Sequence, residues 1–468
     1  MSQQGMNTQE IEIIVRRVLE QLHSPQPDGD QYGVFATLDD AVAAAKDAQP
    51  YLHSVIQRNA IISAIRELAS QHVQELSELA VQETGFGRVE DKIRKNRLVI
   101  EKTPGCEALI PMAITGDHGL SLVENAPWGV IASVTPSTNP SATIFNNAIS
   151  MLAGGNTVVF SPHPAAKAVS QRTIQLINQA SASIGGPASI VSCVEKPSIE
   201  VANQLFVYPG IGLLTITGGD AVVRAARKVS DKRLIAAGPG NPPVVVDETA
   251  DIERAAISIV QGASFDNNIV CVDEKEIIAV DAIADELKQA MTQHGAVEIT
   301  AAQGDAIAAL VLNGYPGPEP HSKVEWIGRD AAAIATAAGF EVPKTTRLLF
   351  METAVDHVFA TTELMLPVIA MIRARDADQA IDWAILLEQG NQHSAAMHSR
   401  NIDNLSRMAS EMDCSLFVKN GPCVAGLGAG GEGWTSMTIA TPTGEGVTNA
   451  ATFVRKRRCT LIDSFRIV

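Results

Sequence analysis

Apolar positions repeat with a helical period along the first part of the chain. Over residues 1–22 they gather on one side of a helix, and charged residues occupy the other side. Residues 23–33, HSPQPDGDQYG, follow with two prolines and two glycines, which is typical of a flexible linker. Such a helix either docks on its own domain or binds a groove on a partner, and a tether of this composition favours the partner. The apolar face consists of Ile11, Ile14, Val15, Val18, Leu19 and Leu22.

From about residue 35 to 103 the pattern stays helical, with long runs at 38–48 and 60–83. After residue 103, short strand-like runs, either wholly apolar or alternating between apolar and polar residues, are followed in turn by helical runs. Regular alternation of this kind predicts a parallel α/β sheet covered on both faces, which binds nucleotides at the carboxyl ends of its strands. The predicted strands are 120–124, 129–134, 156–160, 189–194 and 211–216, and the predicted helices are 142–153, 165–182, 199–206 and 221–228.

A second α/β run starts after the break GPGNPP at 238–243 and continues to about residue 417. It opens with a strand at 244–246, a helix at 252–262 and a strand at 276–280. The last stretch, 450–462, is β-like. We expect it to pair either with the strand near 120–124 or with a neighbouring subunit.

Composition agrees with an α/β enzyme and excludes other classes. The chain of 468 residues is 46% hydrophobic, 19% charged and 4% aromatic, and its formal net charge is −16. That charge argues against a protein that coats nucleic acid or an anionic membrane. We expect no membrane span and no signal peptide, because no uninterrupted apolar run approaches eighteen residues. Six widely spaced cysteines without a CxxC motif indicate reduced thiols and a cytoplasmic setting: 106, 193, 271, 414, 423 and 459.

A glycine pattern near the C-terminus resembles a dinucleotide fingerprint but lacks its context. Gly426, Gly428 and Gly431 spell G-x-G-x-x-G, yet the residues that follow have no helical period. The fingerprint requires a strand before it and a helix after it. We therefore interpret this segment as a glycine-rich loop.

Five segments, taken in order, resemble the aldehyde dehydrogenase superfamily. The details are similar to its CoA-acylating branch, and in particular to the propionaldehyde and acetaldehyde dehydrogenases of bacterial microcompartments. The likeness runs from about residue 34 to the end, and the N-terminal helix resembles the encapsulation peptides of those enzymes. The segments are VTPSTNP at 134–140, TGG at 217–219, AGPGNP at 237–242, GASFDNNIVC at 262–271 and ELMLP at 363–367.

The resemblance implies an aldehyde dehydrogenase-like α/β fold with a Rossmann-type cofactor domain, an α/β catalytic domain and a small β oligomerisation element. In this chain the division is a targeting helix at 1–22, a linker at 23–33, a cofactor-binding domain at 34–237 with a β-strand excursion near 115–126, a catalytic domain at 238–440 and the oligomerisation element at 441–468.

The resemblance assigns the nucleophile to Cys271 and an oxyanion donor to Asn139. A thiolate adds to an aldehyde, and the adduct releases a hydride to a nicotinamide ring and leaves an acyl thioester. The amide of Asn139 and the backbone N–H of the cysteine would hold the oxygen, at about 3 kcal/mol per preorganised donor. A single cysteine is more often a small buried apolar residue, and the other five keep that interpretation. Ser-Thr-Asn-Pro is also a good turn sequence.

The absence of an acidic residue from segment 236–240 favours coenzyme A over water as the acyl acceptor. Hydrolytic relatives carry Glu-Leu-Gly-Gly-Lys where residues 236–240 read AAGPG, so Ala236 replaces the glutamate that activates water. Water needs a positioned base to attack a thioester. The thiol of coenzyme A, with a pKa of about 8.5, supplies thiolate near neutrality without one.

Cofactor residues follow from the same resemblance. Thr217, Gly218 and Gly219 lie between a strand and a helix, where backbone can approach a pyrophosphate. Glu363 matches the glutamate that holds the nicotinamide ribose. His163 either contacts the adenosine or is an ordinary loop histidine, and the resemblance alone favours NAD over NADP. The remaining candidates for cofactor binding are Thr135, Pro136, Ser161 and Gly238, and no metal site is expected.

The sequence therefore predicts NAD- and coenzyme A-dependent oxidation of a short-chain aldehyde, with a hydrolytic dehydrogenase or a non-catalytic shell-binding scaffold as alternatives. Phe417, Cys423 and Trp434 lie in segments that match the substrate side, which implies a small apolar pocket. We expect a homo-oligomer, dimer or tetramer, in the lumen of a cytoplasmic microcompartment. A shell protein would bind residues 1–22.

Overall fold

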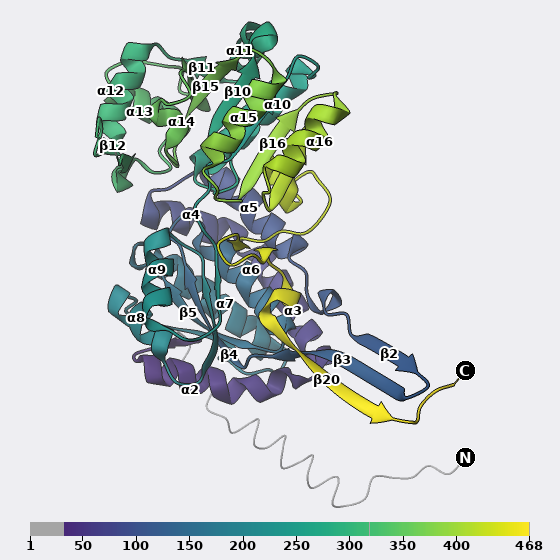
Figure 1. Ribbon diagram of the computed structural model, residues 1–468. Coiled ribbons are helices and arrows are strands. Elements are labelled where there is room, and N and C mark those ends of the chain that lie inside the picture. The colour runs from purple at the N-terminus through teal and green to yellow at the C-terminus, as the bar shows by residue number, and fades with distance from the viewer. Residues whose placement is uncertain (1–31, 318, 468) are drawn as a thin grey trace, which may run out of the picture.

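The computed structural model describes residues 32–317 and 319–467. The predicted targeting helix at 1–22, and all but the last two residues of the predicted linker, lie outside these ranges. The described chain forms two α/β lobes and a narrow β arm (Figure 1). In that part of the chain no helix is long and apolar enough to cross a membrane.

The lower lobe in Figure 1 is built on a six-stranded parallel sheet with the order β1-β6-β5-β4-β7-β8. Successive strands lie on one side of β4 as far as β6, and then β7 and β8 lie on its other side. The gap between β4 and β7 is therefore the switch point where such sheets bind ligands. The strands are β1 Val34–Phe35, β4 Val130–Thr135, β5 Thr157–Pro162, β6 Val191–Val194, β7 Ile211–Ile216 and β8 Leu234–Ala236.

Helices cover this sheet because their apolar stripes need a partner surface. The fourteen residues of α6 are all buried, so this helix lies inside the lobe and carries no solvent face. The helices are α2 Leu38–Ala48, α3 Val55–Gln71, α4 Val73–Thr84, α5 Val89–Lys102, α6 Pro140–Ala153, α7 Lys167–Ser183, α8 Ile199–Val207 and α9 Asp220–Val229.

The upper lobe holds a seven-stranded parallel sheet with the order β11-β14-β15-β10-β9-β16-β17 (Figure 1). Its strands are β9 Pro243–Val246, β10 Glu276–Val280, β11 Ala296–Glu298, β14 Leu348–Thr353, β15 Val368–Ala374, β16 Ser394–His398 and β17 Leu416–Lys419. Its helices are α10 Ile252–Ala263, α11 Asp281–Gln293, α12 Ala301–Val311, α13 Ala331–Ala337, α14 Val358–Thr361, α15 Ala377–Glu388 and α16 Ile402–Glu411.

The β arm joins segments that are far apart in the sequence. Strands β2 Met112–Gly116, β3 Gly119–Pro127 and β20 Val454–Ile462 form an antiparallel sheet that extends away from the lower lobe (Figure 1). Pairing of β20 with β3 confirms the first of the two partners expected for residues 450–462. Within residues 32–317 and 319–467, no second sheet or helix layer covers the arm (Figure 1).

One sequence expectation needs correction. The single helical run expected at 60–83 is two helices, since α3 ends at Gln71 and His72 leaves the helical conformation at φ −106° and ψ 7°. Leu427, Met437 and Ile439 pack in the hydrophobic core of the lower lobe. Small two-stranded pairs complete the described fold: β12 Leu312–Asn313 with β13 His321–Ser322, and β18 Ile439–Ala440 with β19 Gly446–Val447.

Candidate active site

The loops after three neighbouring strands meet at the switch point of the lower sheet. The His163 N–H donates to the Thr135 carbonyl at 3.1 Å, and the Thr217 N–H donates to the Val134 carbonyl at 3.0 Å. These contacts continue the sheet past the ends of β4, β5 and β7. The structure thereby brings together most of the predicted cofactor residues, among them Pro136 and the buried Ser161.

This edge has room and polar groups for a nucleotide. A Cβ built on Gly218 or Gly219 meets no atom within 4 Å, and Gly219 is the N-cap residue of α9. The buried Thr135 hydroxyl has no hydrogen-bond partner among the described residues. Unhindered backbone at a helix N-terminus, next to an unpaired hydroxyl, fits the phosphates of a dinucleotide.

One of the two ring nitrogens of His163 already takes part in a hydrogen bond. Nδ1 accepts a hydrogen bond from the Ala165 N–H at 3.1 Å and so caps the short helix that follows. Partial burial lowers the pKa of the imidazole, which favours its neutral form. His163 as a whole is exposed at the sheet edge, where a bound adenosine could reach it.

The segment 236–240 connects the two lobes, and its glycines have different neighbours. The Ala236 N–H donates to the Thr443 hydroxyl at 3.0 Å. A Cβ on Gly238 would lie 2.6 Å from Cγ of Pro442, so this glycine allows close packing against the loop at 442–443. A Cβ on Gly240 would lie 2.9 Å from both the Cys271 carbonyl oxygen and Cγ of His393. Gly240 therefore lies beside the predicted nucleophile.

Cys271 follows a tight turn that only short polar residues tolerate well. Asp266, Asn267 and Asn268 have φ angles of 46°, 57° and 65°, the left-handed region that asparagine and aspartate enter more readily than other residues with a Cβ. Side chains fix the turn: Asn268 Nδ2 donates to the Ala263 carbonyl at 2.8 Å, and the Lys275 ammonium donates to Asn268 Oδ1 at 2.6 Å. The motif FDNN thus shapes the backbone that presents the cysteine.

Burial and nearby charge control the titration of this centre. Burial, followed by the negative charge of Glu363, raises the pKa of Cys271 to about 12. Burial also raises the pKa of Glu363, whose carboxyl group accepts a hydrogen bond from the Gly240 N–H. Burial lowers the pKa of His393 to about 4, so its imidazole is neutral near pH 7. The free enzyme therefore holds Cys271 mainly as a thiol.

Asn139, the predicted oxyanion donor, is the N-cap residue of α6 and contacts a set of buried charges. Its Oδ1 accepts a hydrogen bond from the Lys95 ammonium, and its Nδ2 donates to the Thr138 hydroxyl at 3.3 Å. Lys95 and Lys92 both donate to Asp266 Oδ2, Lys92 at 3.0 Å. Asp266 precedes Cys271 by five positions. The structure thus links Asn139 to the nucleophile loop through Lys95 and Asp266.

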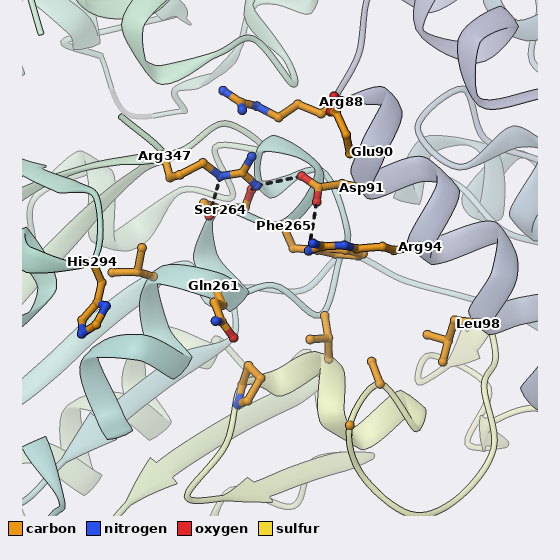
Figure 2. A pocket seen from close by; sticks show the side chains of 15 residues that line it. Arg88, Glu90, Asp91, Arg94, Leu98, Gln261, Ser264, Phe265, His294 and Arg347 are labelled. Carbon is orange, nitrogen blue, oxygen red and sulfur yellow. Dashed lines mark hydrogen bonds and ion pairs between the residues drawn. The ribbon is translucent and has the colours of Figure 1, made fainter. Parts of the chain in front are cut away.

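A cavity of about 720 Å³ lies between α5, α10, the Cys271 turn and the loop at 422–430. Figure 2 shows Arg94 and Arg347 both directed at Asp91, and the Arg347–Asp91 contact is 2.8 Å. Phe265 and Val424 add apolar surface. The loop predicted to lie on the substrate side thus contributes to this cavity, through Pro422, Val424, Ala429 and Gly430 and not through Phe417, Cys423 or Trp434.

Comparisons with known proteins agree with this arrangement. The model of the aldehyde dehydrogenase family matches residues 31–307. The chain is 60% identical, over 99% of its length and 100% of the relative, to the acetaldehyde dehydrogenase (acetylating) EutE of Salmonella typhimurium.

The chain belongs to the aldehyde dehydrogenase family.

Solved structures of family members superpose closely. A propionaldehyde dehydrogenase from the fucose utilisation bacterial microcompartment of Clostridium phytofermentans has a TM-score of 0.90 at 46% identity, covering 93% of this chain and 100% of that one. The propionaldehyde dehydrogenase of Rhodopseudomonas palustris, solved with bound CoA and an acylated cysteine, has a TM-score of 0.90 at 46% identity, covering 92% and 99%. These matches confirm the predicted α/β fold of an aldehyde dehydrogenase.

Sequence reasoning missed three residues of this aldehyde dehydrogenase site: His393, Lys95 and Asp266. Nothing near His393 in the sequence marks it, because it reaches Gly240 only through the fold. The lysines did leave a signal. Lys92, Lys95 and Val99 repeat at intervals of three and four, so the charged groups share a helix face with an apolar residue. Charges on the buried face of a helix need internal partners, and that need points to a functional cluster.

Proposed function

We propose that this protein oxidises a short-chain aldehyde with NAD and transfers the acyl group from Cys271 to coenzyme A. The observation that carries the proposal is the position of Gly240 against the Cys271 carbonyl. It indicates that segment 236–240, which matches the place where hydrolytic relatives hold a water-activating glutamate, reaches the nucleophile at its Gly240 end. The segment contains no acid. The relatives named acetylating, and the relative with an acylated cysteine and bound CoA, support the same reaction.

In the proposed reaction, the Cys271 thiol first loses its proton to solvent. The resulting thiolate attacks the aldehyde carbon, and the carbonyl oxygen takes up the negative charge. Asn139 Nδ2 and the Cys271 N–H donate to that oxygen. NAD, when bound, supplies a hydride acceptor, and loss of hydride leaves an acyl thioester on Cys271. The thiolate of coenzyme A then attacks this thioester, and Cys271 leaves as the thiolate.

The proposed cofactor residues are Thr135, Pro136, Ser161, His163, Thr217, Gly218, Gly219, Gly238 and Glu363. Their support is the open sheet edge for the phosphates and the bond between Glu363 and Gly240, which holds a carboxylate next to the nucleophile. Glu363 also lines a separate hollow of about 440 Å³ with His321 and Thr361.

The first experiment measures NADH formation from acetaldehyde or propionaldehyde with and without coenzyme A. We expect steady turnover only with coenzyme A, acyl-CoA as the product, and no turnover for Cys271→Ala. Equal turnover without coenzyme A would favour the hydrolytic alternative. A wild-type enzyme inactive with both aldehydes would favour the scaffold.

We propose that the aldehyde approaches through the 720 Å³ cavity, which borders the Cys271 turn at Phe265. Its apolar part suits a short alkyl chain. One methylene changes binding by only about 1–3 kcal/mol in an apolar pocket, so a kcat/KM series over two- to four-carbon aldehydes is the direct measure of preference.

We further propose that residues 1–22 bind a shell protein and hold the enzyme in a microcompartment lumen. Support comes from the amphipathic pattern of this segment and from the relative assigned to a fucose utilisation microcompartment. Deleting residues 1–22 should leave kcat unchanged and abolish co-purification with shells. Retained co-purification would contradict the proposal.

The same proposal includes the domain division at 34–237, 238–440 and 441–468, and a homo-oligomer formed through the β arm. The arm exposes apolar side chains, with Ile114 50% and Ile462 64% exposed. Such a surface on an extended sheet favours a second copy. Light scattering of Ile114→Glu should give a smaller species than the wild type, and an unchanged mass would contradict this interface.

A further inference from the structure

A buried set of charges lies behind the proposed oxyanion donor. Lys92 and Lys95 are each 2% exposed, and Asp266 is fully buried. Asp266 Oδ2 accepts from both ammonium groups, and its Oδ1 accepts from the Arg88 N–H at 2.8 Å. Buried charges are unfavourable unless every one is paired, so this cluster is held in one geometry.

Electrostatics keep the carboxylate ionised. Burial opposes ionisation, but the charges of Lys92 and Lys95 more than offset it and hold the pKa of Asp266 below its usual value. Burial lowers the pKa of Lys92 to about 8, although the Asp266 charge opposes that shift. Asp266 is thus an anion to which both lysines are tied.

The contact between Lys95 and Asn139 determines which way the amide points. An ammonium group has only donors, so it can bind only the oxygen of the amide. A flip of Asn139 would bring an NH₂ group against the ammonium and lose a charge-assisted bond. Oδ1 therefore faces Lys95, and Nδ2 donates to the Thr138 hydroxyl.

Asp266 ties the same lysine to the backbone of the nucleophile loop. It begins the left-handed turn that leads to Cys271, and its own N–H donates to Asp91 Oδ2 at 3.2 Å. A Cβ on Gly87 would lie 1.9 Å from Asp266 Oδ1, so the neighbouring loop is shaped to admit this carboxylate. Asp266 is thus linked to the Asn139 amide through Lys95, and it begins the backbone turn that leads to the second proposed oxyanion donor, the Cys271 N–H.

We propose that Lys95 is a positioning residue that fixes the Asn139 amide with its N–H groups toward the reacting oxygen, and that Asp266 holds Lys95 in register with the Cys271 loop. The bond from the ammonium to Oδ1 also polarises the amide and strengthens its N–H as a donor. This inference rests on the proposed function, because it requires Asn139 to act on the oxyanion.

A double-mutant cycle on the full-length enzyme tests the inference. The variants are Asn139→Ala, Lys95→Met and the double variant, with kcat, the KM for NAD and Tm measured for each. We expect Asn139→Ala to lower kcat by about 10²–10³-fold and Lys95→Met by about tenfold or more, with the KM for NAD unchanged. In the Asn139→Ala background the Lys95 change should alter kcat by no more than about twofold. If the role of Lys95 were purely structural, Lys95→Met would lower kcat in the Asn139→Ala background as much as it does in the wild type.

Lys92→Met is the matched comparison, because Lys92 gives Asp266 an equivalent ion pair without touching the Asn139 side chain. We expect a similar loss of Tm and a loss of kcat at least about fivefold smaller than for Lys95→Met. If Lys95→Met does not fold, Lys95→Gln replaces it in the cycle.

Single-variant losses of kcat that multiply in the double variant would overturn the inference, and so would equal losses for the two lysines. An unchanged kcat in Asn139→Ala would overturn it as well. The proposed function fails differently: the wild-type enzyme would then be inactive with both aldehydes, or would turn over equally well without coenzyme A.

Discussion

Gly240 is a sensitive point of the site, because its missing side chain leaves space for two other groups. In Gly240→Ala the new Cβ would lie 2.9 Å from the Cys271 carbonyl oxygen, 2.9 Å from His393 Cγ and 3.1 Å from His393 Nδ1. Ordinary contact begins at 3.4 Å. The φ angle of Gly240 lies outside the left-handed region, so alanine meets no backbone strain there and the whole effect comes from these contacts.

The magnitude follows from which atoms can move. The carbonyl is backbone in the turn that presents Cys271, and His393 is fully buried, so neither group yields without displacing the site. Relief of the overlap requires a shift of roughly 0.5 Å. A misplacement of about 1 Å at a reacting centre costs about 10²-fold in rate, so half of that costs about tenfold, or about 1.4 kcal/mol.

Stopped-flow measurement of the first NADH turnover isolates acylation of Cys271 from later steps. We expect the rate of this burst to fall by about tenfold in Gly240→Ala, with a modest change in Tm. Gly304→Ala in α12 is the matched control: its Cβ would lie 2.4 Å from the Met351 sulfur, a nominally worse overlap with a flexible side chain away from Cys271. Its burst rate should equal that of the wild type.

A Gly240→Ala burst rate within about twofold of the wild type would refute this reasoning. It would mean that the Cys271 carbonyl and His393 can give way without moving the thiol. An equal loss in Gly304→Ala would instead trace the effect to general destabilisation.

Two further predictions concern titration. Since burial and Glu363 raise the pKa of Cys271 to about 12, alkylation of the free enzyme by iodoacetamide should accelerate about tenfold per pH unit from pH 7 to 10, and a plateau below pH 9 would contradict it. Glu363→Gln removes a negative charge and should speed the reaction at every pH in that range. Burial lowers the pKa of Lys92 to about 8 in the folded chain, against about 10.4 in the unfolded chain, so the unfolded state binds more protons between these values. The free energy of unfolding of the wild type, relative to Lys92→Met, should therefore rise with pH in this window, by about 3 kcal/mol at most, and urea titrations that show a fall would contradict this sign.

Much of the fold could be predicted because apolar spacing reports which face of an element is buried. The strands Ile211–Ile216 and Glu276–Val280 were predicted with their observed bounds. Spacing does not detect a single non-helical residue, so the break at His72 was missed even though the flanking helices bury neighbouring faces. Ser54 carried a usable signal for the start of α3, since its side chain accepts from the Gln57 N–H at 3.4 Å.

The site could be predicted only in part, for a similar reason. Cys271, Asn139 and the segment 236–240 lie in local motifs that a family resemblance can read. His393 lies far along the chain from Cys271, and it reaches Gly240 because β16, which follows His393, pairs in parallel with β9, which follows Gly240. No local pattern encodes such a contact.

The sequence by itself determined the α/β class, the candidate nucleophile and the missing acid at 236–240, because composition, periodicity and motif are properties of neighbouring residues. Only the tertiary structure decided what lies behind Asn139. Lys95 lies in α5 and Asp266 lies in the turn before Cys271, 171 positions later in the sequence. They meet because buried charges must find partners inside the fold. The orientation of the Asn139 amide, unlike its identity, is a consequence of that meeting.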